Sequence, residues 1–455
     1  MHPQTLSHMG DSAGARPAWG AVLAMSLGAF VLVASEFMPV SLLSPIAADM
    51  KVSEGQAGQA ISVSGAFALL TSLAIPVLAG RLDRKVLLLG LTLLMIVSGT
   101  LAAFAPNYLT FMVGRAFIGV AIGGFWSMSA ATAMRLVPPQ NVPRALAILN
   151  GGNALATVVA APLGSYLGAF IGWRGAFFCL IPVAALALVW KFASLPALPA
   201  ERKAGGGNVF GLLKNPAVAL GMAGVSLFFM GQFTLFTYLR PFLESVTRVD
   251  NGTLSLLLLV IGVAGLIGTT LIGGFLKEGM MRTLTVIPLL MAGLALALLG
   301  FGDSLGATAV LVGVWGLVAT AAPVGWWTWL ARTLPQDAER GGGLMVAVVQ
   351  LAIASGATVG GLLFDAWGYR ATFGAGALIL LAAAALAAAA GWVSRRSWGR
   401  RARWCGAIPA GSGACRSPGL RPGSRRPAGT PGSSRGAAHP GCGSRRRSAG
   451  SIFCR

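Results

Sequence analysis

Two ionisable side chains lie deep inside apolar stretches of this sequence, Glu36 and Arg115. A charge near the centre of a membrane span costs at least ~2.5–3.5 kcal/mol on insertion scales, so such residues are usually paired and functional. Each lies about seven or eight residues from the same side of the bilayer, which places both at a depth of ~10–12 Å. Two interpretations stay open: a static salt bridge between helices, or a carboxyl group that exchanges a proton while the cation tunes its acidity.

Pro39 follows Glu36 by three positions. Proline has no N–H, so the carbonyl oxygen of Ser35 loses its helical partner and the helix can bend there. Transmembrane helices tolerate prolines in general, so an ordinary proline is the alternative. The closeness of Pro39 to the deep acid favours a functional break.

Further polar and aromatic side chains in the apolar stretches could line a central cavity. Aromatic stacking and amide hydrogen bonds would suit a polar, uncharged or aromatic ligand. Each of these residues could equally be a contact between helices. The candidates are Trp126, Asn150, Asn153, Gln232, Tyr238, Trp327 and Gln350.

Small residues and one charged turn have simpler explanations. The pairs that start at Gly119 and Gly164 have the Gly-x-x-x-Gly spacing that lets helices pack closely, and such glycines more often pack than bind. A turn at residues 80–85 places Asp83 and Arg84 between two apolar stretches. An aspartate there can cap a helix, and cations in such a turn set the topology of the neighbouring spans.

Several chemistries have no support in the sequence. No Gly-Lys-Ser/Thr phosphate loop is present, so ATP is not expected to drive any movement. The chain has 3 His, none of them deep in an apolar stretch, and 5 Cys without metal-ligand spacing. We therefore expect neither an enzyme nor a metal site, and no cofactor.

The composition is that of a membrane protein. Hydrophobic residues make up 55% of the 455 residues, charged residues only 10%, and the mean hydropathy is +0.75, whereas soluble domains carry roughly 25% charge. The net charge of +21 comes mostly from residues 395–455, which contain arginines but no lysine and no acid. This distribution argues against nucleic-acid binding.

Twelve apolar stretches are long enough to span a bilayer, which takes about 20 residues each. Helices are expected, because every backbone N–H must be satisfied within its own segment. No cleavable signal peptide is recognised, so the first helix should remain as an anchor. The predicted spans are 18–44, 56–80, 85–105, 108–137, 143–171, 174–195, 216–242, 253–276, 283–302, 305–331, 342–365 and 370–393.

Loop charges and an internal repeat organise these spans. Lysines and arginines are concentrated in the loops on the side of the two termini, which the positive-inside rule places in the cytoplasm. The stretches at Gly164 and Gly360 resemble each other with an offset of 196 residues, which also relates Arg174 to Arg370. Two six-helix halves of equal orientation follow. The predicted organisation is a cytoplasmic segment 1–17, bundles 18–195 and 216–393, a linker 196–215, and a disordered basic tail 394–455.

The motifs around these residues resemble the major facilitator superfamily, in its twelve-helix proton-coupled drug antiporter branch. Residues 35–43 (SEFMPVSLL) look like the first-helix motif of that branch, and Arg115-x-x-x-Gly119 like the fourth-helix motif, whose Arg is associated with proton coupling. Residues 161–164 (APLG) resemble the fifth-helix antiporter motif, with Ala161 in place of the usual Gly before Pro162. The turn at 80–85 resembles a shortened form of the family's cytoplasmic gating loop, which implies a gating role for Asp83 and Arg84.

A closer resemblance is to the branch of bacterial purine ribonucleoside efflux pumps, covering about residues 17–393. It rests on residues 123–130 (GGFWSMSA), 135–139 (RLVPP), 236–241 (FTYLRP) and 323–326 (PVGW). The resemblance implies a monomeric proton/purine ribonucleoside antiporter of the bacterial cytoplasmic membrane, working by alternating access without nucleic-acid partners. The alternatives are a multidrug or sugar exporter of the same superfamily, and a membrane receptor or sensor without net transport.

Overall fold

The computed structural model describes residues 17–78, 82–199, 209–334 and 337–406. The chain divides into two units, Met1–Gly399 and Arg400–Arg455, and the description below concerns the first. Within the described residues the fold is entirely helical. Residues 1–16 of the predicted N-terminal segment lie outside these residues. Residues 200–208 of the predicted linker and the predicted tail from residue 407 also lie outside them.

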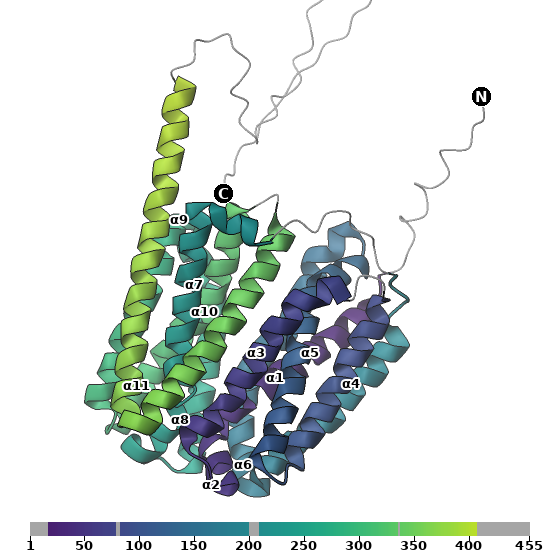
Figure 1. Ribbon diagram of the computed structural model, residues 1–455, viewed down its shortest axis with the longest axis vertical. Helices are drawn as coiled ribbons and strands as arrows, with labels where there is room; N and C mark the ends of the chain where they lie inside the picture. Colours follow the sequence, from purple (N-terminus) through teal and green to yellow (C-terminus); the bar gives the residue numbers. More distant parts are fainter. Residues whose placement is uncertain (1–16, 79–81, 200–208, 335–336, 407–455) are drawn as a thin grey trace, which may run out of the picture. The chain divides into compact units, whose positions relative to one another are not determined.

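Eleven α-helices follow one another along the described residues (Figure 1). The first six form the N bundle: α1 Trp19–Ser41, α2 Leu43–Met50, α3 Glu54–Leu78, α4 Arg84–Ala103, α5 Tyr108–Arg135 and α6 Val142–Ser194. The other five form the C bundle: α7 Pro216–Phe236, α8 Leu239–Phe242, α9 Asn251–Phe301, α10 Leu305–Thr333 and α11 Ala338–Gly406. Short 3₁₀ segments at Pro139–Asn141 and Val209–Lys214 and a π-helical turn at Leu243–Thr247 connect them.

Nine of the described helices are long and apolar enough to cross a membrane by length and composition. Three of these, α6, α9 and α11, exceed 50 residues, about twice what a bilayer requires. Each leaves helical backbone geometry at one glycine: Gly172, Gly279 or Gly368. Two spans joined at each kink would give the predicted twelve, a count that stays a prediction.

Two of these kinks are related by the internal repeat. Gly172 and Gly368 occupy equivalent positions of the two halves, and their φ angles are 74° and 73°. Only glycine adopts this left-handed region without a steric penalty from a Cβ atom. The same local break therefore recurs in both bundles, between the helix that precedes it and the helix that follows.

Close backbone contacts hold neighbouring helices together. A Cβ atom on Gly119 would collide with the carbonyl oxygen of Ser64, and one on Gly123 would collide with that of Ala68. Helix α5 thus lies directly against α3 along the Gly-x-x-x-Gly face. In the same way, the backbone of α6 at Gly152 lies against that of α1 at Ser26.

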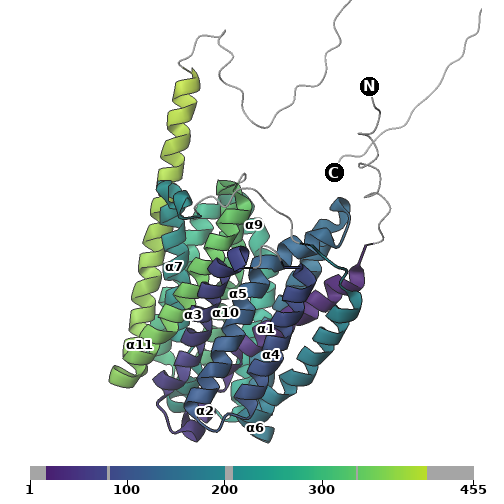
Figure 2. The same ribbon diagram turned by 45° about the vertical axis from the view of Figure 1, so that its right-hand side comes forward.

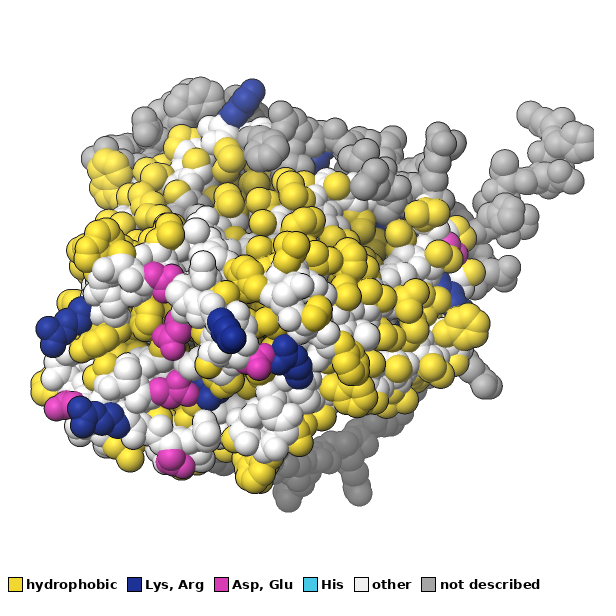
Figure 3. Space-filling model, turned by 60° about the horizontal axis from the view of Figure 1, so that its bottom comes forward, with side chains coloured by type: hydrophobic (Ala, Val, Ile, Leu, Met, Phe, Trp, Pro, Cys, Tyr) yellow, Lys and Arg dark blue, Asp and Glu magenta, His cyan; other side chains and the backbone are white. Residues whose placement is uncertain are grey.

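The surface separates charged from apolar residues. Acidic and basic side chains gather on the face brought forward in Figure 3, whereas apolar side chains cover the flanks. Large exposed apolar side chains on helix flanks would be unfavourable in water and are favourable against lipid. Examples are Leu70, Leu109, Phe170, Phe192, Phe275 and Leu378. The protein is a multi-pass membrane protein.

The boundary predicted at residue 394 falls inside a helix. Disorder was expected from residue 394, but the backbone of α11 continues as a helix through Gly406, as the yellow-green end of the ribbon in Figure 2 shows. Apolar periodicity is lost at Ser394, yet a helix that already exists extends at little cost into residues such as Arg and Ala that favour helices.

Candidate functional site

Glu36 lies near the end of α1, on the side that faces the C bundle. Its side chain is buried, with 5% of its surface exposed. One carboxyl oxygen lies 3.5 Å from Nε2 of Gln350, which belongs to α11. A deep acid of one bundle thus contacts an amide of the other.

Arg115 reaches the same segment of α1 from α5 and is 1% exposed. Its guanidinium donates to the carbonyl oxygens of Ser35 (2.8 Å), Glu36 (3.1 Å) and Ala60 (3.1 Å), and to the hydroxyl of Ser64 (3.3 Å). Four hydrogen bonds occupy most of the five N–H donors of an arginine. The planar fork suits this convergent set of acceptors.

The predicted loss of a helical partner at Ser35 explains where Arg115 binds. Pro39 cannot donate to the Ser35 carbonyl, and the guanidinium supplies the missing hydrogen bond. Arg115 therefore binds the backbone of α1, and among the described residues no ion pair joins it to the Glu36 carboxylate. The structure differs here from the static salt bridge considered for these two side chains.

Gln350 and Gln232 both carry an unused acceptor. Gln350 is 6% exposed, and its Oε1 atom has no hydrogen-bond partner. Oε1 of Gln232, on α7, is also buried and without a partner. Buried acceptors are normally satisfied, so each deserves a functional explanation. Two amides of the C bundle are thus able to accept hydrogen bonds from a further donor.

An apolar plug, which we define as Val40, Ile61, Phe233, Ile353 and Ala357, lies beyond Glu36. The first two residues belong to the N bundle and the other three to the C bundle. The rings of Phe37 and Phe233 stack next to it across the same interface, with centroids 5.8 Å apart. The plug lies between Glu36 and the end of the bundles where α1 stops and α3 begins, which we call the α2 end, and its five side chains are buried.

A groove of about 450 Å³ runs between α3 and α11 beside the plug. The hydroxyl of Thr358 donates to Oε1 of Gln59 (3.1 Å) and is hydrogen-bonded to the hydroxyl of Ser62 (2.9 Å), both across the two bundles. The groove is lined by Ser62, Val63, Ala66, Ala354, Ser355, Thr358 and Val359.

At the α2 end, Asp365 of α11 caps the start of α3. Its carboxylate accepts from the hydroxyl of Ser53 (2.5 Å) and from the backbone N–H of Gly55 (2.9 Å). The first N–H groups of a helix have no intrahelical partner and carry a partial positive charge, so a carboxylate binds there favourably. A side chain at Gly55 would collide with this carboxylate.

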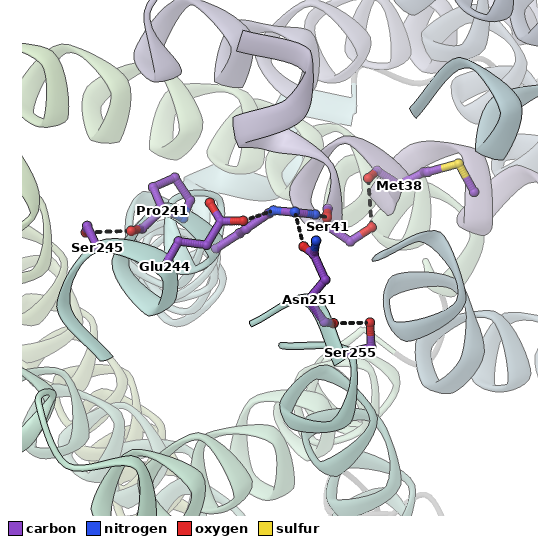
Figure 4. Close-up of polar contacts among 8 residues, drawn as sticks. Met38, Ser41, Pro241, Glu244, Ser245, Asn251 and Ser255 are labelled. Carbon is purple, nitrogen blue, oxygen red and sulfur yellow. Dashed lines mark hydrogen bonds and ion pairs between the residues drawn. The ribbon is translucent and has the colours of Figure 1, made fainter. Parts of the chain in front are cut away.

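Arg240 makes the complementary contact with the end of α1, and Figure 4 labels its partners Ser41, Glu244 and Asn251. It is 4% exposed, donates to the backbone carbonyl of Ser41 and to Asn251 (3.2 Å), and forms an ion pair of 2.7 Å with Glu244. A cation at a helix C-terminus satisfies free carbonyls and the helix dipole. The C bundle thus supplies a cation to the end of α1 and an anion to the start of α3.

Tyr238 lies between these two contacts and is fully buried. Its hydroxyl donates to the carbonyl of Ala357 at 2.8 Å. A Cβ atom at Gly58 or Gly361 would collide with the Tyr238 side chain, so both helices need glycine to close around it. The structure places this predicted cavity residue in the contact at the α2 end.

The opposite end of the bundles, where α1 begins, differs. Between described residues, the hydrogen bonds that join the two bundles all lie between the level of Glu36 and the α2 end. At the opposite end, Asp83 caps α4 and also accepts from the N–H of Leu198, which follows α6. Arg84 contacts the sulfur of Met128. Both contacts of the predicted gating turn are within the N bundle and its following segment.

The other predicted cavity residues form no hydrogen bond with Glu36 among the described residues, although Trp126 packs against a cluster that includes Val33 and Ala34 of α1. Asn150 is exposed and bonds its own helix at Leu146, Asn153 is half-buried, and Trp327 is 46% exposed. Trp126 packs edge-to-face on Phe125 in the N bundle. The Glu36 region therefore unites Arg115, Gln350 and, through the neighbouring Phe233, the stretch that carries Gln232.

Gly164 lies on the face of α6 that packs against α1, and Pro162 lies two residues before it in the same helix. Both are buried, and a Cβ atom on Gly164 would lie 2.8 Å from the hydroxyl oxygen of Ser41. The antiporter-like motif thus contacts the segment of α1 that follows Pro39.

Lys191 is a buried cation near the end of α6. It is 0% exposed, its ammonium donates to the hydroxyl of Thr92 at 2.9 Å, and it lies 5.3 Å from the ring centroid of Phe125. Its position near the end of a span suggested a loop charge, whereas the long side chain bends inward against Gly28.

Among the described residues no group of His, Cys, Asp or Glu could hold a metal ion.

Comparison with known proteins identifies the fold. The sequence matches the Major Facilitator Superfamily over residues 25–357. The chain belongs to this superfamily. It is 62% identical to the protein named transcription regulatory protein OpdE of Pseudomonas aeruginosa, over 83% of this chain and 96% of that protein. It is 41% identical to the purine ribonucleoside efflux pump NepI of Salmonella paratyphi B, over 82% of this chain and 94% of that protein.

The structural comparison agrees. A bacterial homologue of the human lysosomal transporter Spinster, solved in an inward-facing and unoccupied conformation, superposes with a TM-score of 0.68 at 16% identity, covering 83% of this chain and 98% of that chain. The predicted superfamily membership is confirmed, and this transporter has the all-helical fold of the superfamily.

Proposed function

We propose that this transporter exports purine ribonucleosides in exchange for protons, as a monomer in the bacterial cytoplasmic membrane. The observation that carries the proposal is the buried carboxyl group of Glu36 at the interface of the two bundles, in contact with Gln350 and sealed on one side by the apolar plug. An acid at such a position can bind or release a proton only toward the side that is open, which is what exchange transport requires.

The loop charges support an orientation with both termini in the cytoplasm, so the α2 end faces outward. In this orientation, the hydrogen bonds that join the two bundles lie between Glu36 and the outer end. Alternating access then requires the contacts of Asp365, Arg240 and Tyr238 to break while the opposite end closes. A proton would enter Glu36 from outside as substrate leaves and would be released inward.

The substrate class is supported by two independent observations. Relatives at 41% identity are named purine ribonucleoside efflux pumps. Gln232 and Gln350 carry unused acceptors that suit the N–H and O–H donors of a nucleoside. A base with a π face could stack on the aromatic pair Phe37 and Phe233.

Proteoliposomes with an imposed pH gradient test the proposal. Uphill movement of labelled inosine or guanosine is expected, with weaker movement of pyrimidine nucleosides, sugars and cationic dyes. Glu36→Gln should lose gradient-driven accumulation by about tenfold or more, whereas Asp303→Asn, an exposed acid at the α2 end, should resemble the parent. Undiminished coupling in Glu36→Gln would reject the proton role, and preference for dyes or sugars would favour a multidrug or sugar exporter.

A second function, a membrane sensor without net transport, is favoured by the name of the 62% identical relative, a transcription regulatory protein. A sensor would bind ligand without moving it. Counterflow separates the two: exchange of labelled for unlabelled inosine across the membrane supports transport, and binding without exchange supports a sensor.

A further inference from the structure

The side chain of Glu36 has Gln350 as its hydrogen-bonding partner, whereas Arg115 donates to the backbone carbonyl of the same residue. The guanidinium of Arg115 donates its hydrogen bonds to backbone carbonyls of α1 and α3 and to the hydroxyl of Ser64. The Glu36 carboxyl is instead contacted by Nε2 of Gln350, from the other bundle. Among the described residues, Arg115 is the charged group that acts on this carboxyl, and its position is fixed by its backbone contacts.

An amide can serve both protonation states of a carboxyl group. A carboxylate only accepts hydrogen bonds, so it requires the N–H of the glutamine. A protonated carboxyl has an O–H to donate, and the carbonyl end of the same amide can accept it. Rotation of the amide by half a turn exchanges these two ends without moving the backbone.

The surroundings make this exchange consequential. Gln350 is 6% exposed, Glu36 is 5% exposed, and Oε1 of Gln350 has no partner in the state described. The apolar plug borders the pair toward the α2 end. The backbones of α3 and α11 approach each other closely here: a Cβ atom on Gly65 would lie 3.0 Å from the backbone carbonyl oxygen of Gln350. Nε2 of Gln350 and the Glu36 carboxyl oxygen are 3.5 Å apart, at the long limit for a hydrogen bond. If Oε1 instead accepted from a protonated Glu36, this weak contact between the two bundles would be replaced by a different hydrogen bond.

We propose that Gln350 is a positioning residue that reads the protonation state of Glu36 across the bundle interface by exchanging the donor and acceptor ends of its amide. The free Oε1 atom is the end that would accept a hydrogen bond from the O–H of the protonated Glu36 carboxyl. The inference rests on the proposed proton coupling through Glu36. It adds a physical link by which protonation in the N bundle changes the contact with α11.

The first test compares pH profiles of nucleoside transport in proteoliposomes. Gln350→Met keeps the length of the side chain but has no amide. The midpoint of the pH profile of Gln350→Met should shift. The shift should correspond to a change of roughly threefold or more in apparent proton affinity, the size expected for one lost hydrogen bond. The matched control is Gln56→Met, which removes an exposed glutamine amide that accepts from the backbone N–H of Ser53 and does not contact Glu36. Its midpoint should equal that of the parent.

The outcomes separate this inference from the proposed function. If Glu36→Gln loses pH dependence and Gln350→Met has the parent midpoint, the role of Gln350 is wrong and proton coupling stands. If Glu36→Gln keeps full pH dependence, the proposed proton coupling itself fails.

A second measurement does not depend on the folding of the methionine variant. Infrared difference spectra between acid and neutral pH, with ¹³C in the glutamine side-chain amides, should show an amide band that changes in the parent and is constant in Glu36→Gln. An amide spectrum that is unchanged in the parent overturns the inference.

Discussion

Arg115 donates a hydrogen bond of 2.8 Å to the carbonyl oxygen of Ser35, the acceptor that proline at position 39 leaves without a helical partner. The missing N–H at Pro39 in α1 is therefore compensated by the buried guanidinium of Arg115 in α5. The guanidinium completes a helix that cannot complete itself, and this fixes the backbone that carries Glu36.

Pro39→Ala tests this relationship. Alanine restores an N–H for the Ser35 carbonyl, so α1 should become more stable and the protein should melt at an equal or higher temperature in detergent. Transport should fall, because the segment no longer depends on Arg115. Pro288→Ala in α9 is the matched proline inside a helix. Parent-like transport rates in Pro39→Ala vesicles would contradict a functional break.

Part of this arrangement was predictable from sequence. The absence of an N–H at Pro39 predicts a free Ser35 carbonyl, and the matching depths of Glu36 and Arg115 predict that both reach the same level. The sequence does not say that Arg115 binds carbonyls rather than the carboxylate. That choice depends on how α1, α3 and α5 pack, because Ala60 and Ser64 of α3 supply two of the four acceptors.

Contacts at the α2 end were less predictable. Arg240, Asp365 and Lys191 all lie near the ends of apolar stretches, where hydropathy treats charges as loop residues. Burial of Arg240 follows from its reach to Ser41 in the other bundle, which is a long-range contact. By contrast, the two glycines related by the predicted repeat, Gly172 and Gly368, have nearly the same positive φ angle. A backbone conformation that requires glycine can be recognised from the residues around it.

Asp365→Ala should open the α2 end. The substitution leaves the N–H of Gly55 and the hydroxyl of Ser53 without their acceptor and removes a favourable charge from the start of α3. Spin labels at Phe104 and Leu305, which are exposed on different bundles, should give longer distances in a double electron–electron resonance experiment.

Two controls define that experiment. Asp303→Ala removes an exposed acid from the same end and should leave the distances unchanged, and a label pair within the N bundle, at Ala48 and Phe104, should not respond in any variant. Equal distance distributions in Asp365→Ala and the parent would show that this cap does not hold the end closed.

Gly58→Ala should act as a wedge against Tyr238. The added Cβ atom would collide with the phenol ring and hydroxyl, so the melting temperature should fall. In a double-mutant cycle, Tyr238→Ala should relieve much of this loss, with a coupling energy of about 0.5–3 kcal/mol for residues in direct contact. Gly90→Ala, where a Cβ meets no neighbouring atom, should be neutral or slightly stabilising. Additive effects of the two substitutions would disprove the contact.

Lys191→Met tests whether the buried ammonium has a structural or a transport role. The cation has one hydrogen bond, to Thr92, and one aromatic neighbour, Phe125, but no carboxylate partner among the described residues. Replacing a buried charge by an apolar side chain of similar volume is often neutral or stabilising. The melting temperature should therefore stay equal or rise, and nucleoside transport should persist. Lys277→Met provides an exposed lysine for comparison, with an expected change within about 0.5 kcal/mol. Loss of transport at an unchanged melting temperature would instead assign Lys191 to the transport mechanism, since packing would then be intact and only the charge would be missing.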